Sequence, residues 1–190
     1  MNSFRSMIVS KPHKNDEAVL AAMHLIDDEV LSFLATRGTT IDILGARRYD
    51  DASPELRRLG IDVDAWPAPP AGLFVVAERR LYLRSTCVMT VVHELGHAFD
   101  LALSPSDAYW TTTVPTWRTE HAKTMKFVTP YAAAGYDESF AEAFRAWWGA
   151  NNSTSPWPKV TRERLRAVSP ALHRTMERCI TQVIHNASAA

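Results

Sequence analysis

The chain has 190 residues, which suits one domain with a single hydrophobic core, and 46% of them are hydrophobic, as in ordinary globular proteins. Its 21 Lys and Arg residues balance its 21 Asp and Glu residues, and a formal net charge of zero argues against a nucleic-acid-binding surface, which is usually basic. No apolar run reaches the ~18 residues of a membrane-spanning helix, so the sequence predicts no membrane span.

The first residues carry no targeting pattern. Their only apolar stretch, Met7–Val9, is far too short for the core of a signal peptide. This predicts a cytoplasmic protein or one exported by a non-classical route, as a toxin or effector delivered by another system would be. Residues 1–14 are expected to be a flexible N-terminus of a single domain spanning 1–190. Cys87 and Cys179 could form one disulfide, but two free thiols are favoured.

Residues 15–36 place apolar side chains at helical spacing and predict an amphipathic N-terminal helix, with Gly38 just past its end. Residues 39–46 are β-branched and alternate in polarity, so they predict a strand. Residues 50–70 are polar and rich in proline and predict a long loop. That loop ends in WPAPP, which favours a stiff connector, with a place at the rim of a cleft as the alternative.

Residues 72–85 predict a β-hairpin, with two short apolar strands joined by a charged turn. A long and mostly apolar helix is predicted to follow at 85–104, with Ser85 or Thr86 as its cap. Few charged side chains interrupt this helix. That pattern is typical of a helix buried on most sides.

Three further helices are predicted: a weaker one at 115–127, a strongly amphipathic one at 137–149 and a last one at 169–185. The order of helix, strands and helices is typical of the α+β class rather than of alternating α/β folds. We therefore expect a single compact α+β domain with a small, mostly antiparallel sheet that contains the hairpin.

The stretch HELGHAFD, residues 93–100, contains the first candidate site. His93 and His97 are four residues apart on a helix, so both imidazoles can reach one zinc ion at ~2.0–2.1 Å. Glu94 is adjacent and can reach a water molecule without binding the metal itself. The alternative is a pair of core histidines hydrogen-bonded to backbone. Gly96 costs roughly 0.5–1 kcal/mol inside a helix and indicates a close packing neighbour or a strand passing nearby.

A catalytic zinc ion usually has three protein ligands, and no third histidine follows His97 closely. The helix at 137–149 offers Glu138 and Glu142 on one face, and Glu142 could hydrogen-bond a ligating imidazole. The alternative is two exposed glutamates. Asp100, one turn beyond His97, would anchor an imidazole or a neighbouring backbone group, or would be a plain surface aspartate.

HELGHAFD and the later YAAAGYDESFAEAFRAWW together resemble the catalytic domain of anthrax lethal factor and the related Pro-Pro endopeptidases. That family pairs an HExxH helix with a Y-x6-E-x-FAEAF segment, which Tyr131, Glu138 and residues 140–144 match here. The resemblance implies a zincin-like metallopeptidase domain whose C-terminal helices carry the third zinc ligand. The N-terminal half has no motif that can be matched residue by residue.

The resemblance also implies residue roles. One zinc ion per chain is bound by His93, His97 and Glu138. Glu94 is the general base, and Glu142 supports the site. Tyr131 stabilises the oxyanion, with Tyr136 as the alternative donor because it also precedes Glu138 closely.

The expected function is hydrolysis of peptide bonds by a monomeric zinc endopeptidase acting on a protein or peptide bound in extended form. If an edge strand pairs with that substrate, residues 79–85 are the candidates. Two alternatives are a catalytically silent binding module of the same fold and a zinc hydrolase of a non-peptide amide. Preference for a Pro-Pro sequence belongs to one branch of the family, and the motifs leave it open.

Overall fold

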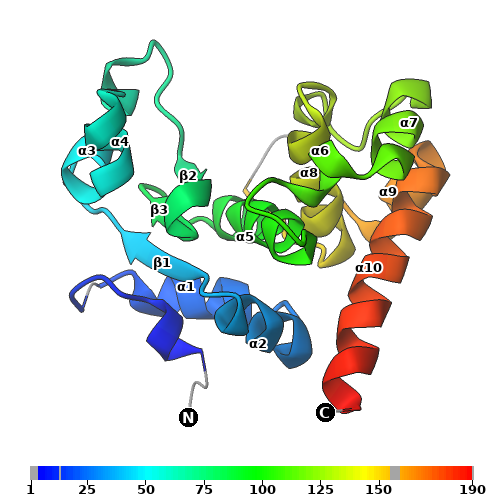
Figure 1. Cartoon of the computed structure of the whole chain (residues 1–190), viewed down its shortest axis with the longest axis horizontal. Coiled ribbons are helices and arrows are strands. Elements are labelled where there is room, and N and C mark those ends of the chain that lie inside the picture. The colour runs from blue at the N-terminus through cyan, green and yellow to red at the C-terminus, as the bar shows by residue number, and fades with distance from the viewer. Residues whose placement is uncertain (1–3, 13, 155–158, 190) are drawn as a thin grey trace.

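A computed structural model describes residues 4–12, 14–154 and 159–189 of the chain (Figure 1). Its N-terminal half contains the 3₁₀ helix η1 Arg5–Met7, α1 Asp16–Met23, α2 Asp28–Thr36, β1 Thr40–Ile43, α3 Tyr49–Ala52, α4 Pro54–Leu59, η2 Val63–Ala65, β2 Gly72–Val75, η3 Val76–Glu78 and β3 Arg80–Leu83. Its C-terminal half contains α5 Val88–Leu103, α6 Trp110–Thr113, α7 Pro115–Lys123, η4 Tyr131–Ala133, α8 Tyr136–Trp147, α9 Arg162–Val168 and α10 Pro170–Ser188. The predicted α+β class is confirmed.

The sheet has three strands in the order β1-β3-β2. β2 and β3 form the predicted hairpin, with Gly72 opposite Leu83, and β1 pairs in parallel with β3, with Thr40 opposite Arg80, so the sheet is mixed. The expectation that residues 79–85 form an edge strand is wrong, because the chain crosses over to bring β1 alongside β3 and places β3 in the centre. Among the described residues β2 pairs with β3 alone and is an edge strand.

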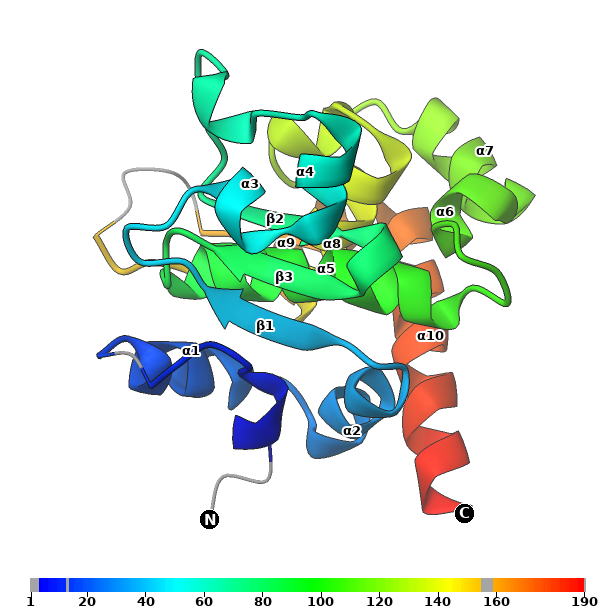
Figure 2. The same ribbon diagram turned by 60° about the vertical axis from the view of Figure 1, so that its left-hand side comes forward.

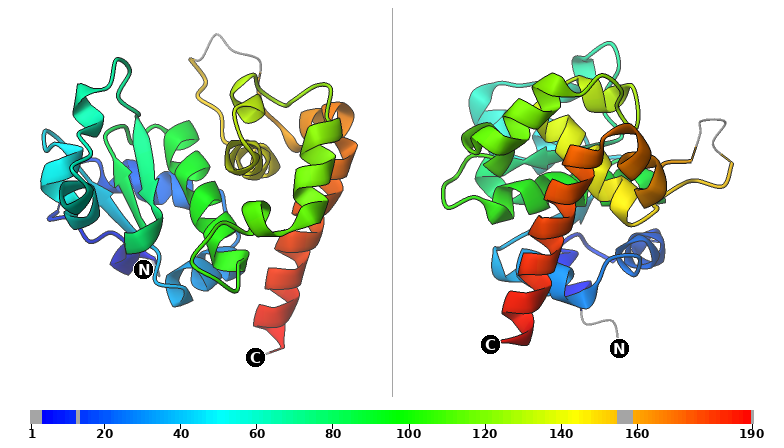
Figure 3. Two further views of the ribbon diagram at one scale, coloured as in Figure 1. Left: turned by 45° about the horizontal axis from the view of Figure 1, so that its top comes forward. Right: turned by 90° about the vertical axis from the view of Figure 1, so that its right-hand side faces the viewer.

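The two faces of the sheet are covered by different helices. α5 lies between the sheet and α8, as the left view of Figure 3 shows, whereas α3 and α4 cover the opposite face (Figure 2). Alternation along β3 explains this arrangement: Leu81 and Leu83 enter the main core, and Tyr82 enters a second cluster with Tyr49 and Leu56. α5 is therefore the central helix of the domain.

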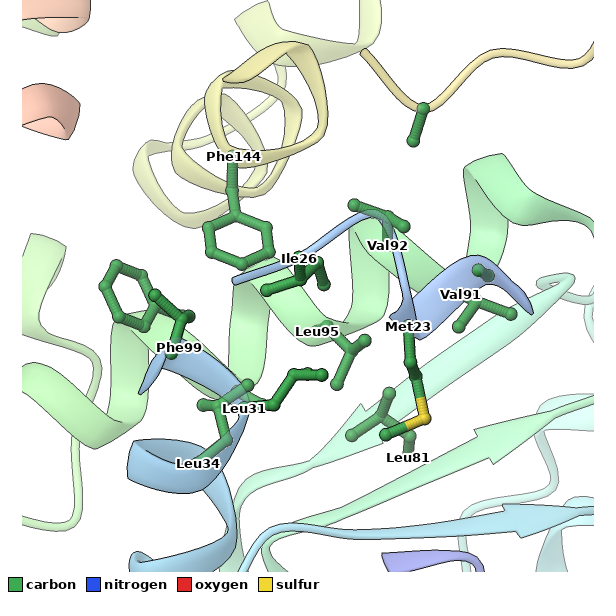
Figure 4. Packing of buried hydrophobic residues seen from close by; sticks show 14 of the residues in the cluster. Met23, Ile26, Leu31, Leu34, Leu81, Val91, Val92, Leu95, Phe99 and Phe144 are labelled. Atoms are coloured by element: carbon green, nitrogen blue, oxygen red, sulfur yellow. The ribbon is translucent and has the colours of Figure 1, made fainter. Parts of the chain in front are cut away.

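The main core forms around α5. Twelve of its sixteen residues are buried, which confirms the prediction of a helix buried on most sides. Figure 4 shows how its apolar side chains meet those of α2, β3 and α8 in one cluster that includes Leu31, Leu34, Leu81, Val91, Val92, Leu95, Phe99 and Phe144. Burial of such side chains stabilises the fold by about 1.5–3 kcal/mol each, so α5 is held firmly against its neighbours.

Gly96 marks the closest approach of two helices. A Cβ atom built on Gly96 would lie 2.8 Å from the Cα of Ala141 and 3.1 Å from its carbonyl oxygen. The close packing neighbour that this glycine predicts is therefore α8. The absence of a side chain lets the backbones of α5 and α8 touch.

The single helix predicted at 15–36 is wrong, because α1 and α2 are separate. Asp27 adopts extended backbone (φ −57°, ψ 141°) and begins α2, whose first turn holds Asp28 and Glu29. Acidic side chains stabilise a helix N-terminus through its dipole, which favours a new start here. Ile26 is buried and continues the apolar pattern across the break, so the sequence pattern concealed it.

The long loop predicted at 50–70 is also wrong, since α3, α4 and η2 occupy most of it. Ser53 caps α4 by accepting a hydrogen bond from the Leu56 N–H at 3.1 Å, and Pro54 follows at the first helical position. This start signal was present in the sequence. The WPAPP segment ends at Pro70, whose carbonyl accepts a hydrogen bond from the Tyr49 hydroxyl at 2.8 Å.

Smaller differences occur at helix ends. The residue that caps α5 is Cys87, without a side-chain bond, rather than Ser85 or Thr86. α9 was not predicted, although Thr161 caps it by accepting from the Arg164 N–H at 3.1 Å.

In the expected flexible segment 1–14, residues 1–3 and 13 lie outside the described residues. Met7 and Ile8 are buried, and Ile8 forms a parallel bridge with Ile41. Among the described residues no helix is long and apolar enough to cross a membrane. Both cysteines are free thiols, as expected.

Candidate active site

Two helices bring three donor atoms to one point. α5 supplies His93 and His97, and α8, in backbone contact with α5 at Gly96, supplies Glu138. The Nε2 atoms of the two histidines are 3.2 Å apart. Glu138 Oε2 lies 3.1 Å from His93 Nε2 and 3.5 Å from His97 Nε2. The three residues predicted as metal ligands are thus assembled from distant parts of the sequence.

This geometry fits a metal ion. Ligands at about 2.0–2.1 Å from a tetrahedral zinc ion lie about 3.3 Å from one another, and the three observed separations bracket that value. Glu138 Oε2 and His97 Nδ1 are buried and make no hydrogen bond with any described residue. Two imidazoles and one carboxylate are also the donor set that zinc prefers.

Glu142 contacts His93 at Nδ1, the ring nitrogen that does not face the other two donor atoms. His93 Nδ1 donates to Glu142 Oε1 at 2.8 Å, and the Thr129 hydroxyl donates to Oε2 at 2.7 Å. Arg145 donates to both oxygens, at 2.9 Å and 2.7 Å. Glu142 is 4% exposed, so the alternative of two exposed glutamates is wrong. The contact fixes the orientation of the imidazole and leaves its Nε2 facing His97 and Glu138.

Sequence reasoning missed Arg145 and Thr129. Arg145 follows Glu142 by three residues on α8, a spacing at which helical side chains meet, so its pairing with Glu142 could have been found. Thr129 lies in the segment that precedes η4 and is brought to Glu142 by the tertiary fold alone.

The charges in this group stabilise one another. Burial would lower the pKa of His93, but the carboxylates of Glu138 and Glu142 outweigh it and raise that pKa to about 10. Burial would raise the pKa of Glu138, yet the rings of His93 and His97 hold it well below its usual range. Burial would also raise the pKa of Glu142, but the hydrogen bonds from His93 and Arg145 outweigh it and lower that pKa to about 2. A bound metal would therefore replace a proton on the His93 imidazole.

Glu94 is buried beneath the start of β2. It is 6% exposed, and burial raises the pKa of its carboxyl group, against the influence of His97 and His93 and a backbone hydrogen bond from Phe74. A Cβ atom on Gly72 would lie 2.7 Å from Glu94 Cγ and 2.8 Å from Thr90 Cγ2. Gly72, another residue that the sequence did not single out, therefore leaves the space that the Glu94 side chain occupies.

The two candidate tyrosines have different surroundings. The Tyr131 hydroxyl donates to Glu138 Oε1 at 3.0 Å, and its ring lies 5.6 Å from that of His93. The ring of Tyr136 instead packs edge-on against His121 at 4.9 Å. This arrangement favours Tyr131 as the donor beside the candidate ligands.

Asp100 is fully buried and is not a surface aspartate. Its two carboxylate oxygens accept hydrogen bonds from the backbone N–H and the hydroxyl of Thr111, at 2.9 Å and 2.6 Å. It therefore anchors a neighbouring backbone group at the start of α6. Tyr109, which precedes α6, has its ring 5.8 Å from that of His97, so this anchor lies behind the second histidine.

Asp100 predicts a pH dependence of stability. Burial raises the pKa of Asp100 to about 7 despite the hydrogen bonds from Thr111. Between pH 5 and 6 the folded state then keeps a proton that the unfolded state has released, so the free energy of unfolding falls as pH rises, by about 1 kcal/mol from this group. Between pH 5 and pH 6 we therefore expect the free energy of unfolding of Asp100→Asn to fall by about 1 kcal/mol less than that of the parent.

The measurement is urea unfolding of the chelator-treated protein at pH 5 and pH 6. Glu94 also has a raised pKa and contributes equally to both proteins. An unchanged slope in Asp100→Asn would show that Asp100 is already ionised in the folded state.

Four of the candidate residues line one cleft of about 720 Å³: His93, Glu94, Tyr131 and Glu142. Its lining includes Gly72 at the start of β2 and the preceding Pro70, His93 and Glu94 from α5, and Tyr131 from η4. Because Pro70 is part of the lining, the WPAPP segment both connects η2 to β2 and ends at the cleft. The cleft is large enough to receive several residues of a peptide.

No family model matches the chain, and no curated protein matches it in sequence. The solved structure of the Pro-Pro endopeptidase PPEP-2 from Paenibacillus alvei matches with a TM-score of 0.64, covering 92% of this chain and 98% of that one at 18% identity. The chain has the fold of this endopeptidase. The predicted Pro-Pro endopeptidase-like fold is therefore confirmed, and the likeness to lethal factor stays a prediction. The chemistry depends on the residues that this chain places in the cleft.

Proposed function

We propose that this chain is a zinc-dependent endopeptidase that holds one zinc ion and acts on a peptide or protein as a monomer. One observation carries the proposal: donor atoms of His93, His97 and Glu138 converge within 3.5 Å, and His93 and the buried carboxylate Glu94 line one cleft. Likeness in fold to a protein described as a Pro-Pro endopeptidase supports the same class of reaction.

The residues divide the chemistry among them. His93, His97 and Glu138 would hold zinc, which when bound polarises the scissile carbonyl and acidifies the attacking water. Glu94 accepts the proton that the water loses as its oxygen bonds to the carbonyl carbon, and returns it to the amide nitrogen as the C–N bond breaks. Tyr131 donates a hydrogen bond to the carbonyl oxygen as that atom gains negative charge.

The substrate would bind as an extended chain along β2. This strand is an edge of the sheet, and its first residue, Gly72, and the preceding Ala71 line the cleft. A peptide that pairs with such an edge gains backbone hydrogen bonds whatever its side chains, and the cleft walls then select among sequences.

The decisive experiment measures zinc and peptide hydrolysis together. Protein purified without chelators should contain about one zinc ion per chain, Glu138→Ala should lose it, and Glu94→Ala should keep it. Glu94→Ala should hydrolyse peptides from a mixed library at least about 10²-fold more slowly than the parent. A parent chain without zinc after reconstitution would overturn the proposal, and zinc without peptide cleavage would leave a binding module or a hydrolase of other amides.

Gly72→Ala tests the position of the general base. The added Cβ would lie 2.7 Å from Glu94 Cγ, so Glu94 must shift. Displacement of a catalytic group by about 1 Å can cost about 10²-fold, so we expect kcat to fall tenfold or more. Zinc content should stay at the parent level, because the three atoms nearest to the added Cβ belong to Glu94 and Thr90 and not to a candidate ligand. Full activity would show that Glu94 acts from more than one position.

A further inference from the structure

The cleft continues past the candidate zinc ligands to a positively charged end. The part of its lining that α8 supplies includes Glu142 and Arg145. Arg145 follows Glu138 by seven residues and therefore lies about 10 Å from it along the helix axis. Beyond α8 the lining passes to Asn151, Asn152, Lys159, Val160 and Arg164. The proposed reaction uses none of these last residues.

Two cations at this end lack a carboxylate partner within the described residues. Arg145 is paired with Glu142, but Lys159 makes no described hydrogen bond or ion pair. Among the described residues the Arg164 side chain donates only to the Val128 carbonyl, from Nε at 3.2 Å. Eight described arginines pair with an aspartate or glutamate, whereas the charges of Lys159 and Arg164 in the cleft are not neutralised in this way.

The backbone that carries these cations is held in place. Asn151 accepts a hydrogen bond from the Val160 N–H at 2.8 Å and donates to the Val160 carbonyl at 2.7 Å. Val160 itself is 3% exposed and belongs to the main core. Lys159 is therefore anchored by its neighbour, and Arg164 is anchored by its own bond to Val128.

We propose that this end of the cleft selects peptides with an acidic side chain on one side of the cleaved bond, bound by Lys159 and Arg164. This inference rests on the proposed function of the cleft. An extended peptide advances about 3.3 Å per residue, and Arg145 already lies about 10 Å along α8 from Glu138, so the acidic side chain that reaches Lys159 and Arg164 stands three or more residues from the cleaved bond. The cleft lining also contains Val128 and Pro130, which suit apolar residues nearer the cleaved bond.

The test compares peptides that differ in one charge. An apolar peptide library carries Glu, Gln or Lys at each position in turn, and binding to the zinc-loaded Glu94→Gln protein is measured by fluorescence anisotropy beside turnover by the parent. Exposed ion pairs contribute about 0.2–1 kcal/mol each, so we expect the Glu peptide to be preferred about three- to tenfold at its best position, and less at high salt.

Charge reversal gives the matched comparison. Lys159→Glu and Arg164→Glu should each shift the preference from the Glu peptide towards the Lys peptide. Lys123→Glu, an exposed lysine outside the cleft lining, should keep the parent preference.

The outcomes separate this inference from the proposed function. Equal binding and cleavage of Glu and Gln peptides at every position would overturn the inference and leave the endopeptidase standing. Preferential binding of Glu peptides that Lys159→Glu reverses, without any cleavage by the parent, would support the inference and overturn the peptidase.

Discussion

Gly96→Ala is expected to destabilise the domain and to loosen the zinc site at once. The added Cβ would lie 2.8 Å from the Cα of Ala141 and 3.1 Å from its carbonyl oxygen, both backbone atoms that cannot rotate away. α5 and α8 must separate, and overpacking of this kind costs about 1–3 kcal/mol. Because Glu138 stands on α8 and both histidines on α5, the separation also pulls the third ligand away.

Two measurements check this prediction. Urea unfolding gives the loss of stability, and competition with a zinc chelator gives the zinc affinity. We expect that affinity to fall about tenfold or more, because a loss of about 1.4 kcal/mol of binding free energy raises Kd tenfold. Ala141→Gly should fail to rescue the variant, because the nearest atom is the Ala141 backbone.

Gly60→Ala provides the control for the Gly96 substitution. An added Cβ there meets nothing within 4 Å, but φ is +66°, so it should cost about 1 kcal/mol through backbone strain and leave zinc affinity unchanged. Parent-like zinc affinity in Gly96→Ala would show that the two helices can part without moving Glu138.

Glu142→Ala is expected to have the largest effect on stability. It removes the shared partner of His93, Thr129 and Arg145 and leaves Arg145, a residue that is 7% exposed, without its carboxylate. Breaking a buried ion pair in this way costs about 3–5 kcal/mol. Zinc affinity should also fall about 10- to 100-fold, because the imidazole of His93 loses the acceptor that orients it.

A double substitution separates the two effects. Glu142→Ala with Arg145→Met removes the stranded charge, so we expect part of the lost stability to return. Zinc affinity should stay low, because His93 is still without its acceptor. The pair of measurements is urea unfolding of chelator-treated protein and chelator competition. Recovery of zinc affinity in the double variant would mean that Arg145, and not His93, transmits the effect of Glu142.

The sequence by itself determined the helices that carry the site. The apolar run at 85–104 predicted a buried helix, and the spacing of His93 and His97 placed both imidazoles on one face. Glu138 and Glu142 were found by the same helical periodicity. Local patterns of this kind need no knowledge of neighbouring elements, which explains why α5, α8 and the hairpin were predicted correctly. At 15–36 apolar periodicity wrongly predicted one helix, because Ile26 continues the pattern across the break between α1 and α2.

Only the tertiary structure decided what the site contains beyond those helices. Thr129, Gly72 and Lys159 reach the cleft from segments whose local sequence carries no sign of it. The central place of β3 also follows from a crossover that brings β1 alongside it, a non-local pairing that strand patterns do not encode. Helical spacing constrains residues within one turn of each other, whereas the approach of separate segments depends on packing of the whole core around α5, where Gly96 lets two backbones meet.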